Sequence, residues 1–356
     1  MSVNIAMSVN RLVKIFSKFV LSIPLLANPL FSKPLLAITS FVKSLIKPLA
    51  VLTLLTMLTP LITSCEKAQP LNIAYHSWIG YQFPFLSDQT SDDSMLHYRQ
   101  TADSAESMQL LKSKQVDAAY LTLDEVLRMQ DQGVDLTVVL IADISAGADI
   151  VLGQSNITNA QEIKNKTIGY EANALGEFML YHFLKKYQLT KSDVNLVNID
   201  VKNSISAFKN KQIDIVISYY PIAQQLIKLN AVTLFDSQEI PDTIVDVLAI
   251  RNQISDQKHH QILDAVKKHF NGVNYLNINY EDGKYQLASL LDTNAQEIDY
   301  SLSHLILPSE QANYRLLNDK AAIKKVLTEL TQQMKATGLI HNLSNKKPIF
   351  TDEFIQ

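Results

Sequence analysis

The stretch that decides the fold reads VDAAYLTLDEVLRMQDQGVDLTVVLIADISAGADIVLG and covers residues 116–153. Residues 117–121 form a short apolar run, residues 123–132 carry apolar side chains at helical spacing, and residues 135–144 are almost continuously apolar. A continuous apolar run is typical of a strand that is buried on both faces of a sheet. Strand, helix and strand in this order predict an α/β fold, in which helices cover the sheet.

The same alternation continues on both sides of this stretch. We expect further strands at 71–75, 95–100, 148–153, 166–170, 194–199, 213–218, 232–235 and 244–250. We expect helices at 104–113, at 175–187, near 204–210, after Pro221, and over much of the chain beyond residue 255, including 255–280 and 319–337. Two successive sets of strands and helices predict two lobes, each a mainly parallel sheet flanked by helices, with a ligand cleft between them.

Two loops are predicted to carry the chain between these lobes. The first crossover is expected at residues 153–156 and the second at residues 236–242. Lobe one would then consist of residues 71–153 and 243–356, and lobe two of residues 154–242.

Charge is distributed unevenly along the chain. Six basic residues and no Asp or Glu precede Cys65, so the formal net charge of −3 leaves −9 on the residues from Cys65 onward. A basic, acid-free N-terminal segment is typical of a targeting leader. The acidic remainder argues against nucleic acid as a partner, because phosphate binding needs a basic face.

The N-terminal segment ends in a pattern that is typical of export signals. Lys43 and Lys47 precede the apolar run LAVLTLLTMLTPLI at 49–62, which is shorter than the roughly 18 residues expected of a membrane span. The sequence Ile62-Thr63-Ser64-Cys65 closes this run and resembles the lipobox of bacterial lipoproteins, with Ile62 where Leu is more usual. The resemblance implies a diacylglycerol thioether on Cys65, which becomes the new N-terminus and anchors the protein in a membrane.

The lipobox also predicts the location of the protein. Residues 1–64 would be removed as a leader, and residues 65–70 would link the lipid to a body on the periplasmic side of a bacterial membrane. The residue that follows Cys65 is Glu66 and not Asp, and the sorting pattern of bacterial lipoproteins then implies the outer membrane in a Gram-negative host. Prolines interrupt the apolar pieces of residues 1–42, so we expect no second clean span there. Because the leader is unusually long, we expect translation to start downstream of Met1. The alternative is an uncleaved anchor in which Cys65 is incidental.

The sequence contains no motif for catalysis or for a metal. It has no Gly-x-Ser-x-Gly elbow, no nucleotide-binding glycine loop and no His-Glu-x-x-His. The eight histidines are scattered, and a single cysteine allows neither a thiolate zinc site nor an intrachain disulfide. We therefore expect no catalytic residues, no metal and no cofactor.

Candidate ligand-binding residues lie in the loops that follow the predicted strands. In open α/β sheets, ligands bind at the carboxyl ends of the strands. Aromatic side chains offer flat apolar surface with polar handles, and small residues let the backbone approach a ligand closely. The candidates are Trp78, Gly80, Tyr81, Thr122, Asp124, Ser145, Gly147, Glu171, Asn173, Ala174, Tyr219 and Asp246.

Several of these residues also have a purely structural interpretation. Trp78 could cap the core of its lobe, and Thr122 or Asp124 could cap a helix. Residues 143–149 could form a plain tight turn, and Glu171 could be a solvated carboxylate.

The loops give only partial guidance on the ligand. Of Tyr219 and Tyr220, one is expected to face the cleft and the other to pack. An oxyanion would call for Arg or Lys, which these loops lack. Acidic residues lie near them instead, namely Asp143, Asp149, Glu171 and Asp246. Either backbone amides alone hold an anion, or the ligand is neutral, zwitterionic or cationic, with a slight preference for an amine-bearing or neutral solute.

These segments, in this order, resemble the nitrate/sulfonate/taurine class of ABC-importer substrate-binding proteins. The resemblance covers residues 70–250 clearly and the helical tail weakly, and it rests on the ordered series rather than on one motif. The matching segments are Trp78–Tyr81, Val116–Glu125, Gly133–Leu136, Ser145–Asp149, Ile168–Glu171, Ala174–Gly176, Ile213–Asp214, Tyr219–Pro221, Pro241 and Ile244–Leu248.

The resemblance implies a type II periplasmic-binding fold and a receptor function. A monomer would capture a small organic molecule or an oxyanion by hinge closure and dock on a membrane permease, whose ATPase is a separate polypeptide. The family relative that makes thiamine pyrimidine uses clustered cysteines, which this chain lacks after Cys65. The alternative is a sensory or accessory binding lipoprotein of the same fold that signals to a membrane partner.

Overall fold

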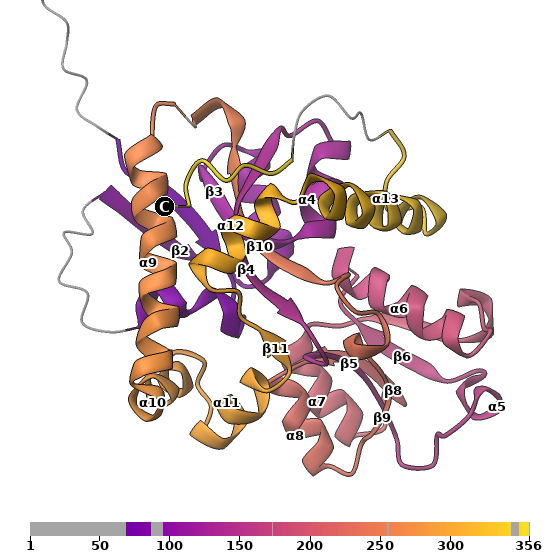
Figure 1. Ribbon diagram of the computed structural model, residues 1–356. Coiled ribbons are helices and arrows are strands. Elements are labelled where there is room, and N and C mark those ends of the chain that lie inside the picture. Colours follow the sequence, from indigo (N-terminus) through magenta and orange to yellow (C-terminus); the bar gives the residue numbers. More distant parts are fainter. Residues whose placement is uncertain (1–68, 87–94, 173, 255, 343–348, 356) are drawn as a thin grey trace, which may run out of the picture. The chain divides into compact units, whose positions relative to one another are not determined.

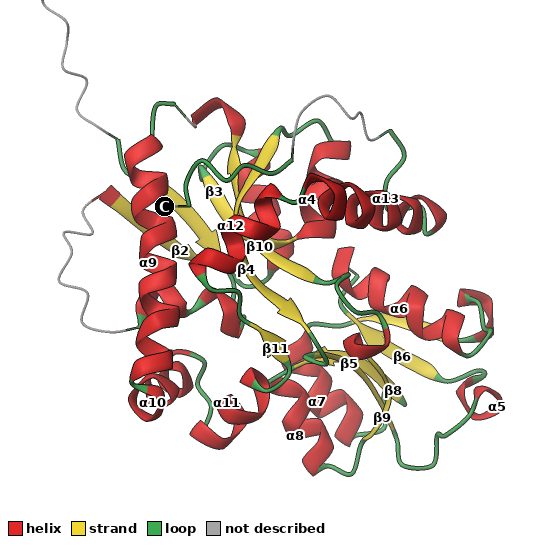
Figure 2. Cartoon of the chain, in the orientation of Figure 1, coloured by secondary structure: helices red, strands yellow, loops and turns green. Residues whose placement is uncertain are grey.

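Two separate β-sheets organise the computed structural model, which describes residues 69–86, 95–172, 174–254, 256–342 and 349–355. The predicted leader, the lipobox with Cys65, and Asn173 lie outside the described residues. Strands and helices alternate through both sheets, as the sequence pattern predicts (Figure 2).

The first sheet has six strands in the order β11-β4-β10-β3-β1-β2. Their bounds are β1 Leu71–Tyr75, β2 Leu96–Gln100, β3 Ala118–Thr122, β4 Leu136–Ser145, β10 Val245–Arg251 and β11 Leu305–Ile306. Strand β1 pairs in parallel with β2 and β3, whereas β10 is antiparallel to both β3 and β4, and β11 is antiparallel to β4. The sheet is therefore mixed rather than mainly parallel. The antiparallel members are β10, which re-enters this sheet from the second lobe, and the short β11 at its edge.

The second sheet has five strands in the order β7-β6-β8-β5-β9. Their bounds are β5 Asp149–Gly153, β6 Thr167–Tyr170, β7 Asn195–Asn198, β8 Ile215–Tyr219 and β9 Val232–Asp236. The pairs β6–β7 and β6–β8 are parallel, and β5 is antiparallel to β8 and β9, so this sheet is mixed as well.

Strand β5 corrects the predicted boundary between the lobes. It was expected to end lobe one, but it pairs only with strands of the second sheet. The first crossover is therefore the turn between Ser145 and Asp149, and residues 153–156 do not cross. A fully apolar strand such as β5 fits the interior of either sheet, so its composition does not reveal which sheet it joins. The second crossover lies between β9 and β10, where it was predicted.

The two crossovers contact each other. The backbone N–H of Gly147 donates to Ser237 Oγ over 2.6 Å, and the hydroxyls of Ser145 and Ser237 lie 2.8 Å apart. Gly147 has φ +112°, which favours glycine, and a Cβ there would lie 2.7 Å from the His304 ring. Both crossovers therefore form one short double connection between the lobes.

Helices cover both sheets (Figure 1). Those between the strands are α3 Ser104–Lys112, α4 Leu123–Asp131, α5 Ala160–Ile163, α6 Ala174–Lys186, α7 Val201–Lys209 and α8 Ile222–Lys228. Those of the C-terminal part are α9 His259–Ile278, α10 Tyr280–Leu290, α11 Ala295–Leu302, α12 Glu310–Asn318 and α13 Lys320–Ala336. The 3-10 helices are η4 Ile79–Tyr81, η5 Phe83–Phe85, η7 Lys191–Asp193, η8 Ser237–Glu239 and η9 Asn252–Ile254. In Figure 1 the second sheet has α6 on one side and α7 and α8 on the other.

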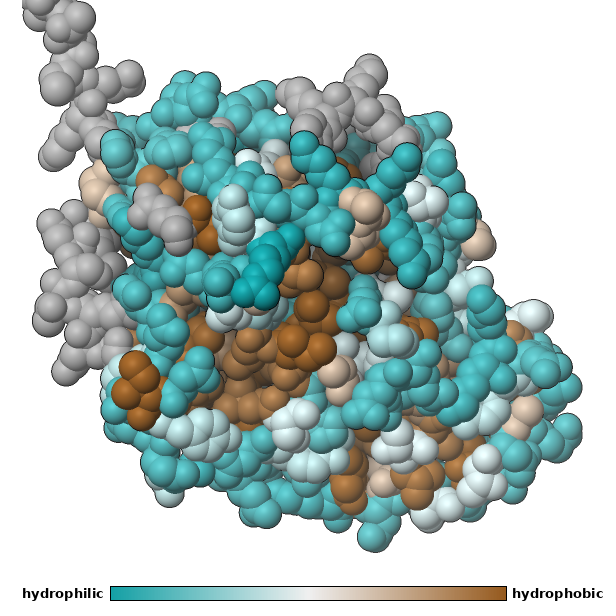
Figure 3. Space-filling view, in the orientation of Figure 1, coloured by the Kyte–Doolittle hydropathy of each residue, from teal (hydrophilic) through white to brown (hydrophobic). Residues whose placement is uncertain are grey.

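Burial follows the apolar runs of the sequence. Eight of the ten residues of β4 are buried, and every residue of β3 and β10 is buried. Helix α4 buries Val126, Leu127 and Met129 on one face. Figure 3 shows a largely hydrophilic face, with hydrophobic residues gathered near β11, where Ile306 is half exposed. The apolar runs thus account for the core, and the polar side chains buried at the strand ends need another explanation.

Candidate ligand-binding cleft

A narrow cavity lies where the ends of strands from both sheets meet. Twelve residues line it: His76, Trp78, Tyr81, Asp103, Ser104, Thr122, Glu125, Asp149, Glu171, Leu175, Tyr219 and Asp246. The volume of this cavity is about 30 Å³. Ligand sites for organic molecules measure roughly 300–1,000 Å³, so an organic solute needs the two walls to move apart.

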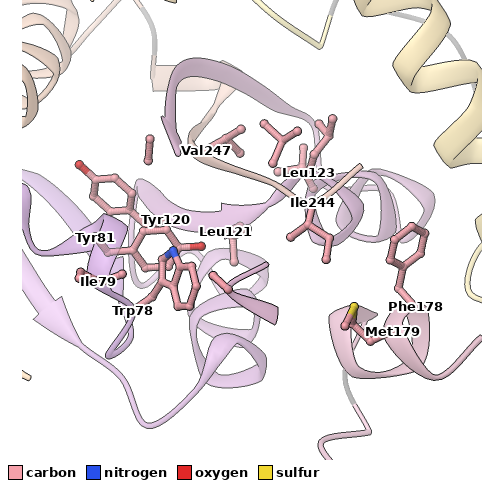
Figure 4. Packing of buried hydrophobic residues seen from close by; sticks show 14 of the residues in the cluster. Trp78, Ile79, Tyr81, Tyr120, Leu121, Leu123, Phe178, Met179, Ile244 and Val247 are labelled. Carbon is pink, nitrogen blue, oxygen red and sulfur yellow. The ribbon is translucent and has the colours of Figure 1, made fainter. Parts of the chain in front are cut away.

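The wall from the first lobe is built around two aromatic residues after β1. The Trp78 Nε1–H donates to Asp143 Oδ2 over 3.0 Å, and the Tyr81 hydroxyl donates to Asp246 Oδ1. The Tyr81 ring lies 5.0 Å from the Tyr120 ring, between centroids. Figure 4 shows Trp78, Tyr81 and Tyr120 packed together. These contacts fix both rings in place on the lobe-one side of the cavity.

Gly80 belongs to this wall without lining the cavity. A Cβ at Gly80 would lie 1.7 Å from Asp143 Oδ2 and 3.0 Å from Trp78 Nε1. The missing side chain therefore lets Asp143 reach the indole of Trp78, and this supporting contact explains the glycine better than direct contact with a ligand.

Thr122 and Glu125 join β3 to α4 at the cavity. Thr122 precedes the first turn of the helix, and its backbone N–H donates to Glu125 Oε2 over 3.0 Å. This is one half of a capping box, so the structural interpretation of Thr122 applies, although the residue also lines the cavity. Asp124, the other predicted residue of this segment, is buried but does not line the cavity.

The wall from the second lobe comes from the ends of β6 and β8. Tyr219 contacts Trp78 edge to face, with 5.6 Å between the ring centroids, so the two aromatic residues meet across the lobes. Glu171 accepts a hydrogen bond from the backbone N–H of Val201 over 3.3 Å. Tyr220 is buried and packs against Tyr300, 4.8 Å between centroids. As predicted, one tyrosine of this pair faces the cleft and the other packs.

Burial disfavours the charged form of the acidic residues in the cleft. It raises the pKa of Asp149 to about 6, and the nearby Glu125 adds to the shift while the Ser145 hydroxyl opposes it. Burial also raises the pKa of Glu171 to about 7. Burial raises the pKa of Asp246 well above its usual range, and repulsion from Asp143 adds to this shift. Burial also raises the pKa of Asp143. Among the described residues that line the cavity there is no Lys or Arg to counter these effects.

The outcomes for the predicted site residues differ. Six of them line the cavity: Trp78, Tyr81, Thr122, Glu171, Tyr219 and Asp246. Ser145 and Gly147 instead form the first crossover, where the hydroxyl of Ser145 contacts the second one. Ala174 begins α6, and only its backbone is described.

The sequence interpretation missed six lining residues: His76, Asp103, Ser104, Glu125, Asp149 and Leu175. Asp103 and Ser104 form the joint between β2 and α3, so the rule on strand ends applied to β2 finds them. Asp149 was placed near the candidate loops but not among the ligand-binding candidates, and β5, which it begins, was assigned to the wrong sheet. Its position at the crossover puts its side chain between the lobes.

Comparison with known families identifies the chain. The model of the family described as NMT1/THI5 like matches residues 95–275, which is more than half of the 356 residues. The chain belongs to the NMT1/THI5-like family. A search of curated protein sequences returned no match. The match spans most strands of both lobes, which agrees with the resemblance that the ordered segments show to nitrate/sulfonate/taurine-binding proteins.

Solved structures place this NMT1/THI5-like chain in the periplasmic-binding-protein fold. The alkanesulfonate-binding protein SsuA from Xanthomonas axonopodis pv. citri, bound to MOPS, is similar with a TM-score of 0.65 and 15% identity, covering 81% of this chain and 99% of SsuA. The Candida albicans CA3427 gene product, which has the generic periplasmic binding protein fold, gives a TM-score of 0.57 and 14% identity, covering 78% and 92%. The predicted fold class is confirmed.

A desulfurization enzyme has the same fold. DSZB is similar with a TM-score of 0.58 and 12% identity, covering 80% of this chain and 96% of the enzyme. Within the described ranges, no three His, Cys, Asp or Glu side chains are grouped as a metal site would need. A search of the same residues for a helix long and apolar enough to cross a membrane found none.

Proposed function

We propose that this protein is the solute-binding receptor of an ABC importer. The observation that carries the proposal is the cavity itself, because its aromatic and acidic walls come from both lobes of a periplasmic-binding-protein fold. A solute held between the lobes contacts both walls and so stabilises the closed form over the open one. The similarity to a sulfonate-binding protein supports a binding role.

Hinge opening at the double crossover would admit the solute. Two short segments connect the lobes, Ser145 to Asp149 and Asp236 to Val245, and hinges are typically a few such residues. The small volume of the cavity supports this proposal, since a rigid cleft of this size would exclude an organic solute.

Delivery would require a membrane partner and an anchor. We propose a lipid anchor at Cys65 on the periplasmic side of a bacterial membrane, which rests on the resemblance of residues 62–65 to a lipobox. The lipidated monomer would dock on a permease, and a separate polypeptide would hydrolyse ATP. Mass spectrometry of the protein extracted from cells tests the anchor, because a mature chain that begins at a diacylated Cys65 is the expected product.

Binding rather than catalysis is the proposed role of the cleft. The fold itself does not decide this, because a desulfurization enzyme shares it. Incubation of the protein with its captured solute is expected to return the solute unchanged, and formation of a product would contradict a pure receptor function.

Capture from a mixture of metabolites tests the proposal directly. The full-length protein, purified in mild detergent and freed of bound molecules by reversible unfolding, is incubated with the small-molecule fraction of a cell extract. Mass spectrometry is expected to find one enriched solute that a Trp78→Ala/Tyr219→Ala variant does not retain. Tyr285→Ala is the control, because Tyr285 is 63% exposed on α10. Equal recovery from all three proteins, or no enrichment by the wild type, would refute the receptor function. Loss of cellular uptake of that solute on gene deletion would support delivery.

A further inference from the structure

The two walls of the cleft carry carboxyl groups, which are charges of the same sign when they are ionised. Glu125 and Asp246 line the cavity from the first lobe, and Asp149 and Glu171 line it from the second. Asp103 adds a fifth carboxylate at its edge. Like charges that face each other across a closing cleft raise the free energy of the closed form. Closure is therefore favoured when something positive lies between the walls.

One of these carboxylates has an oxygen that no described residue satisfies. Asp149 is 4% exposed, and its Oδ2 is buried with no hydrogen-bond partner among the residues that the structure describes. A buried acceptor without a donor is costly, so native structures rarely leave one without a reason. Asp149 lines the cavity, and a donor placed in the cavity is within its reach.

The other carboxylates of the site already have donors from the protein. Asp246 accepts from the Tyr81 hydroxyl, Glu125 from the backbone N–H of Thr122, and Glu171 from that of Val201. None of these donors is a cation, so a negative charge on any of these three carboxyl groups is hydrogen-bonded by these donors but not balanced by them. Arg128 lowers the pKa of Asp124, which is buried next to Glu125 but does not line the cavity.

The aromatic residues of the cavity suit a cation as well. Trp78, Tyr81 and Tyr219 line the same space as the carboxylates, and Trp78 meets Tyr219 edge to face at 5.6 Å between centroids. The faces of such rings attract ammonium and guanidinium-like groups, most strongly for Trp. Carboxylates and aromatic rings together recognise an organic cation, whereas neither group attracts a sulfonate.

We propose that the ligand is a small organic cation, an ammonium or amidinium compound, whose charged N–H group or charged head lies at Asp149 between the carboxylates of both lobes. This inference rests on the proposed receptor function and adds the class of its solute. The cation balances the repulsion between the walls, so charge neutralisation and lobe closure are coupled. Anionic solutes, including sulfonates, are excluded by the same charges.

The single tryptophan of the chain provides the assay, because Trp78 lines the cavity and no other Trp contributes fluorescence. The full-length protein in mild nonionic detergent is titrated with two charged and neutral pairs of similar shape. The pairs are choline with 3,3-dimethylbutan-1-ol, and benzamidine with benzamide. Methanesulfonate is the anionic probe.

At least one cation is expected to change Trp78 emission saturably, with an affinity at least tenfold above that of its neutral partner. Asp149→Asn is expected to weaken this binding by about tenfold or more, because a charge-assisted hydrogen bond contributes roughly that factor. Asp264→Asn is the matched control, since Asp264 is exposed on α9, and it should leave the affinity unchanged. Glu171→Gln, at the half-buried edge of the cleft, is the second variant if Asp149→Asn fails to give a cooperative thermal transition.

The possible failures are distinguishable. Equal binding of charged and neutral partners, tighter binding of methanesulfonate, or no response to either cation up to about 10 mM would overturn the cation proposal. A saturable response to a neutral or anionic probe that Tyr219→Ala abolishes would leave the receptor function intact. Absence of any response, together with no solute captured from extract, would overturn both.

Discussion

The acidic residues of the two lobes differ in how their oxygens are satisfied. In the first lobe, Asp143 and Asp246 accept hydrogen bonds from Trp78 and Tyr81, whose rings are themselves 5% and 1% exposed. Asp143 Oδ1 in the first lobe and Asp149 Oδ2 in the second are both buried with no hydrogen-bond partner among the described residues, but of these two only Asp149 lines the cavity. The aromatic donors of the first wall are therefore already in place, whereas a donor for Asp149 can come from whatever enters the cleft. Preassembly of one wall lowers the entropy cost of binding, because only the other wall has to be ordered.

The largest effect is expected from Asp149, whose pKa is raised to about 6 from 3.8. A carboxyl with a raised pKa stabilises the fold fully below its unfolded pKa and loses that contribution as pH rises through its folded pKa. The unfolding free energy of the ligand-free protein should therefore fall between about pH 4 and pH 6. Asp149→Asn should remove up to about 3 kcal/mol of this fall, measured by denaturant titration at several pH values.

The neighbours of Asp149 act in the same direction. Repulsion from Glu125 raises its pKa, and Asp149 in turn raises those of Asp124, Asp143 and Asp246. The fall in the unfolding free energy of the wild-type protein should therefore extend toward pH 7. In Asp149→Asn this fall should be smaller but still present. An unchanged pH profile in this variant would contradict the burial of a strained carboxylate in the second wall.

Gly80 tests the rigidity of the first wall. Gly80→Ala should lower the free energy of unfolding by about 2 kcal/mol, because the new methyl group would displace Asp143 from Trp78. Gly169→Ala in β6 of the second lobe is the comparison, since its Cβ would meet only side-chain methyl groups of Ile213 and Ile199. Thermal unfolding of both variants measures the difference in stability. An equal loss of unfolding free energy would mean that the first wall is no more rigid than the second lobe at these positions.

Trp78 tests the donor that satisfies the first wall. Trp78→Phe keeps an aromatic ring but removes the Nε1–H from buried Asp143, so a loss of about 1 kcal/mol is expected. Tyr219→Phe, at the half-buried end of β8, should cost less. Denaturant unfolding at pH 8 compares the two. A larger cost for Tyr219→Phe would reverse the contrast between the walls.

The smallest effect is expected on the outside of the cleft. His182 Nε2 of α6 lies 3.1 Å from Gln333 Oε1 of α13, which links the second lobe to the helical tail. Gln333→Ala should change the free energy of unfolding by less than about 1 kcal/mol, and Gln332→Ala, an exposed neighbour, should change nothing. Small-angle scattering of the ligand-free variant should show a slightly larger radius of gyration if this contact favours closure.

The sequence predicted the elements well and their assembly less well. Apolar runs such as those of β3 and β4 indicate strands because side chains on both faces must be buried. The same property explains the error at β5, because an apolar run does not say which sheet buries it. The direction of β10 was not predicted for a related reason. Its composition is like that of its neighbours β3 and β4, but it runs antiparallel to both.

The site was predictable where chemistry coincides with a strand end. Trp78 and Tyr219 follow strands and are large polar aromatics, so the rule for α/β sheets finds them. Glu125 was not chosen, because it lies in the first turn of a helix and looks like a cap residue, which it also is. The unpartnered oxygen of Asp149 depends on every residue packed around it, and no local pattern contains that information.

The position of β10 has a consequence for the order of folding. Lobe two is formed by one continuous segment, from β5 to β9, so its sheet can form as soon as that segment is available. The sheet of lobe one cannot close in the same way, because β10 lies between β3 and β4 and follows them by more than the whole of lobe two. Pairing over so long a separation is slow, since the loop entropy is lost before any contact forms. A chain that emerges N-terminus first can pair β3 with β1, but it lacks the strand between β3 and β4 until residue 251 is free, so the sheet of lobe one is completed after that of lobe two.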